Sequence, residues 1–196
     1  MGRIKSALEI ALERTGAVKS DKSSIEQFEA KQQGKRLANQ FLEDGKQAVL
    51  EEGIKKTPRE RQTALKQGIF DILLSQLGLP LTGEDEKRIT AAGKGLQAVI
   101  GDPRFGAVNK QLGQILSRYL DQSAQYEEAI KRQYAPKLRQ KEEELSRRLG
   151  RQVQIDPFQD PEFAAFYNQN MNALKGSYQS AVDQVREEAI RLFEKR

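Results

Sequence analysis

Two long runs of apolar residues at helical spacing, separated by a short break, most constrain the fold of this chain. The first run comprises Val108, Leu112, Ile115, Tyr119, Tyr126, Ile130, Tyr134, Leu138, Leu145 and Leu149. The second comprises Phe163, Tyr167, Met171, Leu174, Tyr178, Ala181, Val185, Ala189 and Leu192. Spacings of three, four and seven residues place such side chains along one stripe of a helix, as in a coiled coil. The sequence therefore predicts two long helices that pair along these stripes.

The break between the two runs, residues 149–163, carries signals that end one helix and begin another. Gly150 is suited to end the first helix, and Asp160 followed by Pro161 is suited to begin the second. We therefore predict a long antiparallel helical hairpin over residues 102–196, with its tip near residues 150–160. A register that sets Leu149 opposite Pro161 would bring Tyr134 near Gly176. Pro136, inside the first run, predicts a kink or a short break.

Residues 1–101 carry four shorter helical patterns, which we expect to pack at the open end of the hairpin. The patterns cover about residues 1–15, 24–53, 58–77 and 82–100. Their predicted boundaries are Gly16, Ser24, the pair Thr57-Pro58, Gly78, the pair Thr82 and Asp85, and Gly101. The polar middle of the second helix, around Gly34, suggests that it is kinked or only partly packed. Strand-like runs are nearly absent, so the predicted fold class is all-α.

The chain contains no Cys and no His, and this limits its chemistry. Without them there is no thiolate nucleophile, no Ser-His-Asp triad and no zinc site that uses His or Cys. An enzyme would need carboxylates or lysines in a pocket that sequence alone does not reveal. We therefore predict a non-enzymatic protein with no catalytic residue, no cofactor and no metal site.

Three motifs that resemble ligand sites are better explained by helix structure. Residues 91–96 resemble a phosphate loop, but Arg88 and Gly95 stand where a Walker A motif needs Gly and Ser or Thr, so close helix packing is the better interpretation. Carboxylates also follow one another at residues 84–86 and 142–144. Neighbouring side chains on a helix point in different directions, so the carboxylates of each run do not converge on one ion. A calcium site is conceivable from Asp156, Asp160 and Glu162. The spacing of an EF-hand is missing, however, and capping explains the two Asp residues, each of which precedes a Pro.

Two surfaces of the predicted hairpin are candidates for binding a partner. The aromatic candidates at the tip are Phe158, Phe163 and Phe166. They either close the end of the apolar stripe or dock into a partner protein. The basic candidates are Lys137, Arg139, Arg147, Arg148 and Arg151. Eight positive and three negative side chains lie between residues 131 and 151, a pattern that favours polyanions, so a nucleic-acid-associated protein is the alternative. The formal net charge of +5 is mild for this length.

The opening residues 4–15, with Ile4, Ala7, Leu8, Ala11 and Leu12, resemble the start of uncharacterised bacterial helical proteins. The resemblance implies a bacterial cytoplasmic protein and brings no activity and no site residue. No stretch approaches the roughly 18 uninterrupted apolar residues of a membrane span. We therefore expect a cytoplasmic interaction or scaffold protein that binds a protein partner or a second copy of itself and does not bind a membrane.

Overall fold

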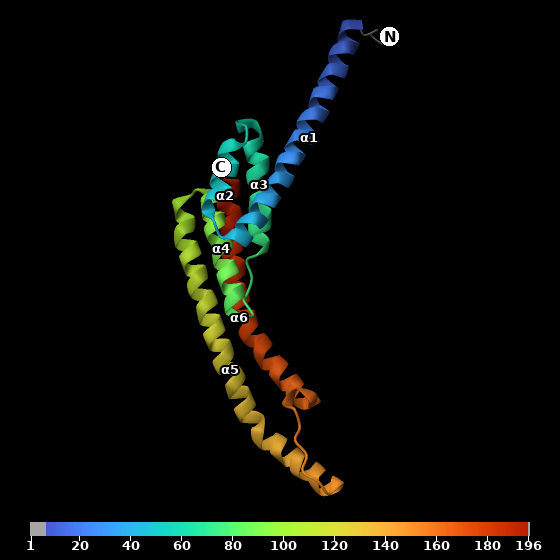
Figure 1. Cartoon of the computed structure of the whole chain (residues 1–196), viewed down its shortest axis with the longest axis vertical. Helices are drawn as coiled ribbons and strands as arrows, with labels where there is room; N and C mark the ends of the chain where they lie inside the picture. Colours follow the sequence, from blue (N-terminus) through green and yellow to red (C-terminus); the bar gives the residue numbers. More distant parts are fainter. Residues whose placement is uncertain (1–6, 196) are drawn as a thin grey trace, which may run out of the picture. The chain divides into compact units, whose positions relative to one another are not determined.

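The computed structural model describes residues 7–195, with side chains from residue 23 on, and this part of the chain is all-helical (Figure 1). The helices are α1 (Ala7–Asp44), α2 (Gln47–Lys56), α3 (Arg59–Ser75), α4 (Gly83–Ile100), α5 (Pro103–Leu149), the short 3-10 helix η1 (Pro157–Gln159) and α6 (Pro161–Glu194). No strand occurs among the described residues. The predicted all-α class is therefore confirmed.

The described residues divide into two compact units. The first contains the chain up to Gln76 together with Ala91–Pro103, and the second contains Leu77–Thr90 together with the chain from Arg104 on. Helix α4 therefore contributes residues to both units. That residues 1–101 and 102–196 are separate regions, with the shorter helices at one end of a hairpin, stays a prediction.

In the first unit, α1 and α3 run in the same direction and α2 connects them. Gln27 of α1 donates a hydrogen bond to the carbonyl of Glu60 at the start of α3, over 2.9 Å. Further along both helices, Gly34 of α1 lies against the main chain of Leu65. Gly45, with φ 67°, lies between α1 and α2, in the left-handed region that glycine adopts at little cost. The core of this unit contains Ala30, Ala38, Phe41, Leu50, Leu65, Ile69 and Leu73.

The predicted boundaries within α1 are wrong. The helix runs from Ala7 to Asp44 without a break at Gly16 or Ser24, because a single Gly or Ser inside a helix costs only about 1 kcal/mol or less. The predicted start at Met1 lies outside the described residues. The break in this region lies instead at Gly45, between α1 and α2. The predicted single helix over residues 24–53 is therefore also wrong.

The residues around Gly34 were expected to be kinked or only partly packed, but at Gly34 itself the packing is close. A Cβ atom on Gly34 would overlap the carbonyl oxygen of Leu65, and one on Gly68 would overlap the carbonyl oxygen of Lys31. The two helices therefore approach each other at their main chains. Lys31 and Asp71 form an ion pair beside this crossing, with Nζ 2.8 Å from Oδ2.

Thr57 was predicted to cap α3, but it instead ends α2. Its hydroxyl donates to the carbonyl of Gly53 over 2.8 Å, and its amide donates to that of Ile54. The side-chain amide of Gln62 also donates to the carbonyls of Ile54 and Thr57. Helix α3 begins at Arg59, one residue after the Pro that was predicted as its first helical position. The Thr57 hydroxyl, which was predicted to cap α3, therefore binds a carbonyl at the end of α2 instead.

In the second unit, α5 and α6 lie side by side (Figure 1). The rings of Tyr119 and Tyr178 have centroids 5.3 Å apart. The Tyr167 hydroxyl donates to Glu127 over 3.3 Å, and Tyr134 contacts Phe163 with a centroid distance of 5.2 Å.

These contacts correct the predicted register. Tyr134 lies beside Phe163 and not near Gly176, because α5 continues well past the start of α6. Helix α5 also runs through Pro136 without a break. The apolar stripe of α5 is buried at Leu112, Tyr119, Ile130 and Tyr134 but exposed at Tyr126, Leu145 and Leu149. The stripe is therefore not a continuous buried seam.

Candidate interaction site at the end of α5

The chain after α5 folds back along the last turns of that helix. We call residues 150–160 the return segment, and residues 141–160 the tip. The amide of Val153 donates to the Ser146 hydroxyl and that of Ile155 donates to the Glu142 carboxylate, each over 2.9 Å. The return segment is thus held by side chains of α5 before α6 begins.

Both Asp residues of the return segment cap helices, as predicted. The Asp156 carboxylate accepts from the amide of Phe158 over 3.0 Å at the start of η1. The Asp160 carboxylate accepts from the amide of Glu162 over 3.1 Å at the start of α6. No group of three or more acidic residues among the described residues is arranged to hold a metal ion.

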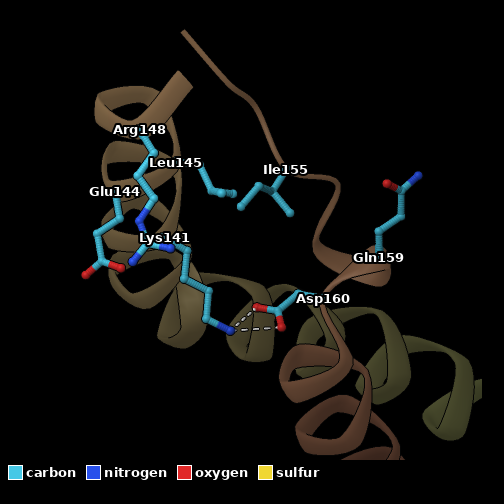
Figure 2. Close-up of a pocket in the computed structure, with 7 residues that line it drawn as sticks. All are labelled: Lys141, Glu144, Leu145, Arg148, Ile155, Gln159 and Asp160. Atoms are coloured by element: carbon cyan, nitrogen blue, oxygen red, sulfur yellow. Dashed lines mark hydrogen bonds and ion pairs between the residues drawn. The ribbon is translucent and has the colours of Figure 1, made fainter. Parts of the chain in front are cut away.

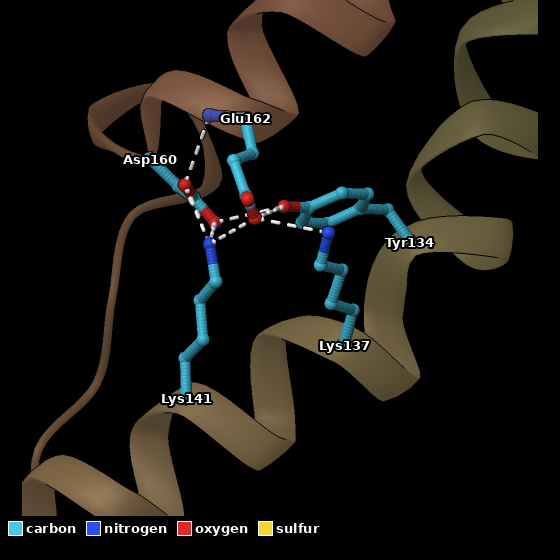
Figure 3. Close-up of polar contacts among 5 residues, drawn as sticks. All are labelled: Tyr134, Lys137, Lys141, Asp160 and Glu162. Atoms are coloured by element: carbon cyan, nitrogen blue, oxygen red, sulfur yellow. Dashed lines mark hydrogen bonds and ion pairs between the residues drawn. The ribbon is translucent and has the colours of Figure 1, made fainter.

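Asp160 also belongs to an ionic cluster of five residues that joins α5 to the start of α6 (Figure 3). Lys141 Nζ lies 2.8 and 2.9 Å from the two Asp160 carboxylate oxygens and 2.7 Å from Glu162 Oε2. Lys137 Nζ lies 2.9 Å from the same Glu162 oxygen. The Tyr134 hydroxyl donates to Asp160 Oδ2 over 3.0 Å and to Glu162 Oε2 over 3.3 Å. The Asp160 side chain is only 4% exposed, so this cluster fixes where α6 begins.

The charges of the cluster stabilise one another. Hydrogen bonds and charge from Lys141, and then from Lys137, lower the pKa of Glu162 to about 2. The pKa of Asp160 is lowered mainly by its hydrogen bond with Lys141, whose own pKa is raised by the two carboxylates. Burial, and then Asp160, raise the pKa of the Tyr134 hydroxyl. None of these four groups has its pKa moved towards neutral pH, so the cluster acts as an ionic clamp.

The structure brings the three predicted aromatic residues together, in different environments. Phe163 is 1% exposed and packs against Tyr134, whereas Phe158 is 51% exposed although its ring lies 5.3 Å from that of Phe163. Phe166 is partly buried, with its ring centroid 6.1 Å from that of Tyr134. The rings of Phe158 and Tyr167 are 5.2 Å apart, edge to face. Phe163 and Phe166 therefore belong to the core, and Phe158 forms its exposed edge.

A pocket of about 350 Å³ lies between α5 and the return segment (Figure 2). The side chains of Leu145 and Ile155 face each other across it, and the Lys141–Asp160 ion pair closes one end. The remaining lining residues are Glu144, Arg148 and Gln159. The pocket combines two aliphatic side chains with charges of both signs, which suits contact with a polypeptide better than with a polyanion.

The basic residues predicted as a polyanion-binding face lie on more than one side of α5. Lys137 is engaged by Glu162, and Arg147 lies 3.9 Å from Glu143. Arg139 and Arg148 are nine residues apart on α5, which places them on opposite sides, about 180° apart at 100° per residue. Arg151 follows the end of α5, in the return segment.

The other motifs have structural roles, as the sequence suggested. A Cβ atom on Gly95 would lie 2.7 Å from atoms of both Leu73 and Phe41, so the small residue permits close packing. Thr82 and Asp85 form a reciprocal cap at the start of α4: the Thr82 amide donates to Asp85 Oδ2 over 2.9 Å, and the Asp85 amide donates to Thr82 Oγ1 over 3.2 Å.

Sequence reasoning missed Lys141, Glu142, Ser146 and the role of Tyr134 at the tip. Tyr134 was assigned to the apolar stripe, and the other three looked like residues of a solvated helix face. Their roles depend on the path of the return segment, for which the sequence offers only the alternation of Val153 and Ile155. That alternation predicts a short extended stretch, but it does not reveal that the stretch is held by side chains of α5.

The fold and the tip define an all-helical protein in which an ionic clamp and an aromatic cluster support an exposed end. The chain belongs to a family of unknown function, DUF6657, whose model matches residues 51–191. No curated protein and no solved structure matches the chain. The family match does not include residues 4–15, on which the resemblance to bacterial helical proteins rests, so bacterial origin stays a prediction. No helix in the described part of the chain is long and apolar enough to cross a membrane.

Proposed function

We propose that the protein is a non-enzymatic interaction or scaffold protein of the cytoplasm, in which α5 and α6 form a long antiparallel hairpin that presents its tip to a protein partner. The observation that carries the proposal is the exposure of apolar side chains on a well-anchored tip. Leu149 is 56% exposed, Phe158 51% and Leu145 37%. Exposed apolar groups on a rigid support are typical of protein-binding surfaces.

The anchoring of the tip supports this function. The clamp of Lys141 on Asp160 and Glu162 fixes the start of α6, and side chains of α5 hold the return segment. A surface that is already ordered loses less conformational entropy when it binds. The tip therefore suits direct docking onto a partner.

A capture experiment with matched variants tests this function. Leu149→Glu and Phe158→Glu place charges at the exposed tip, and Leu81→Glu is the control because Leu81 is 84% exposed elsewhere in the chain. Proteins from the native organism would be captured on each immobilised variant and quantified by mass spectrometry. We expect a partner that the wild type and Leu81→Glu retain and both tip variants lose. Identical capture by all four proteins would refute the proposal.

Nucleic-acid binding through the basic residues of α5 is the second candidate. Arg139, Arg148 and Arg151 have no ion pair with any described residue, and this supports it. The test is fluorescence anisotropy with labelled single-stranded and duplex DNA and RNA at low salt. Binding that weakens with salt and in an Arg147→Ala, Arg148→Ala, Arg151→Ala variant would favour this candidate. Absence of binding at low salt would remove it.

A further inference from the structure

The pocket at the tip accommodates the end of a chain better than a chain that passes through it. Leu145 and Ile155 form its apolar walls, and the Lys141–Asp160 ion pair closes one end (Figure 2). A polypeptide that runs along α5 towards Lys141 meets this ion pair and cannot continue. The volume of about 350 Å³ is at the lower end of the range of ligand pockets, which suits one or two residues at a chain end.

Arg148 is the cation of the pocket whose charge is not matched by a partner. The charge of Lys141 is matched by the two carboxylates of the ionic clamp, which lie 2.8 and 2.7 Å from its Nζ. Arg148 forms no ion pair with any described residue, and neither does Glu144. Figure 2 shows the Arg148 side chain running along α5 towards Lys141, and the Glu144 carboxylate on the side of α5 away from Ile155. A negatively charged group that enters between the apolar walls is therefore complementary to Arg148.

We propose that the pocket binds the carboxyl terminus of a partner polypeptide that ends in a branched aliphatic residue such as leucine. The inference rests on the proposed function and names the chemistry of the partner. The aliphatic side chain lies between Leu145 and Ile155, and the terminal carboxylate accepts two parallel hydrogen bonds from the Arg148 guanidinium. Arg148 follows Leu145 by three residues, so their side chains are neighbours on one face of α5. A terminal residue carries its side chain and its carboxylate on the same Cα atom, which matches this close spacing.

An acidic residue inside a partner chain fits the pocket less well. In an extended peptide, consecutive side chains point to opposite sides, so an aspartate next to the bound leucine would point away from Arg148. A helical segment could present both side chains on one face, but its diameter is about 10 Å or more. Such a helix cannot enter between α5 and the return segment, which side chains of α5 hold in place. A chain end avoids both difficulties.

Peptides that differ only at the last residue test this chemistry. The probe is a fluorescein-labelled peptide Gly-Ser-Gly-Ser-Leu with a free carboxyl terminus, and fluorescence anisotropy measures its binding to the wild-type chain up to millimolar concentration. The controls are the same peptide with a terminal carboxamide and a peptide that ends in alanine. We expect the carboxamide to bind roughly tenfold more weakly, because it has lost the charge that pairs with Arg148. The alanine peptide should also bind roughly tenfold more weakly, because it buries less apolar surface. Equal affinities of all three peptides, or no binding of the leucine peptide, would overturn the inference.

An arginine variant and its matched control connect the carboxylate to Arg148. Arg148→Gln should weaken binding of the leucine peptide roughly tenfold and leave binding of the carboxamide peptide unchanged. Arg139→Gln is the control, because Arg139 is exposed on the opposite side of α5 and also forms no ion pair with any described residue. An equal loss in both variants would show a general attraction of charge and would overturn the inference. Free leucine that displaces the peptide at equal concentration would assign the pocket to a small amino acid and would also overturn it.

The outcomes separate this inference from the proposed function. A wild type that binds no leucine peptide, with partner capture still dependent on Leu149 and Phe158, would overturn the inference and leave the proposed function in place. Peptide binding that depends on Arg148, together with identical capture by the wild type and both tip variants, would instead refute the proposed role of the exposed apolar side chains.

Discussion

Gly34 of α1 and Gly68 of α3 lie at one crossing point, and each faces the main chain of the other helix. A Cβ atom on Gly34 would overlap the Leu65 carbonyl, and one on Gly68 would overlap the Lys31 carbonyl. Side chains at these two positions would have to push the helices apart. The close packing of α1 against α3 at this crossing therefore requires glycine at both positions.

The first prediction is that Gly34→Ala and Gly68→Ala each lower the free energy of unfolding by about 3 kcal/mol, the upper range for overpacking a rigid contact. The clashing atoms belong to the main chain and cannot move aside as a side chain would. Urea denaturation followed by circular dichroism measures the effect. The control is Gly176→Ala, where nothing lies within 4 Å of the added Cβ. This control should raise stability by up to about 1 kcal/mol, and an equal effect at all three glycines would contradict the packing argument.

Hydrophobic periodicity did not reveal this crossing, because it counts apolar side chains and the contact is made by main chain. The residues around Gly34 are polar in sequence and were interpreted as kinked or only partly packed. The caps were more predictable: Asp160, Pro161, Thr82, Asp85 and Gly150 act as the sequence indicated. A cap is a local interaction over three or four residues, whereas a helix crossing joins residues that are more than thirty positions apart.

The second prediction concerns pH and the clamp at the start of α6. Glu162 has a folded-state pKa of about 2, below its ordinary value of 4.5. Its contribution to stability is therefore fully present above about pH 5 and is lost as the pH falls through the folded pKa. Lys141→Met removes the main cause of the low pKa values of Glu162 and Asp160. We expect a lower thermal midpoint at pH 7 and a smaller further loss between pH 5 and pH 2.

The control for the clamp is Lys131→Met, on the same helix. Lys131 pairs with Glu127 at 2.7 Å and takes no part in the clamp. Its removal should leave the pH dependence of the thermal midpoint as in the wild type. Carbon-detected NMR titration of the Glu162 carboxylate measures the pKa directly. A Glu162 pKa that stays near 2 in Lys141→Met would show that Lys137 alone holds it there.

The clamp could not be predicted because it depends on how far α5 extends past the start of α6. Setting Leu149 opposite Pro161 treats the return segment as a tight connection. The segment instead runs back along about one turn of α5, from Ser146 to Glu142, and this brings Asp160 to Lys141. Apolar spacing fixes which stripe of each helix is buried but leaves the register of two long helices open, since a shift of seven residues preserves the pattern.

The third prediction is that Pro136→Ala stabilises the protein. Pro136 lies inside the continuous helix α5, is exposed, and cannot donate a hydrogen bond to the preceding turn. Alanine restores that donor, and the free energy of unfolding should rise by up to about 3 kcal/mol. Gly113→Ala, in the same helix and with open space around the added Cβ, should give about 1 kcal/mol. A loss of stability in Pro136→Ala would show that the contacts of Tyr134 with α6 depend on the proline at this position.

The fourth prediction separates buried Phe163 at the start of α6 from exposed Phe158 of the tip. Phe163 is 1% exposed within the cluster that includes Ile130 and Tyr134, so Phe163→Ala should lower the free energy of unfolding by about 3–5 kcal/mol. Phe158→Ala should lower it by only about 1 kcal/mol, because half of that ring is already in contact with water. Urea denaturation of both variants tests this difference. Similar losses would mean that Phe158 belongs to the core, and the exposed surface of the tip would then reduce to Leu145 and Leu149.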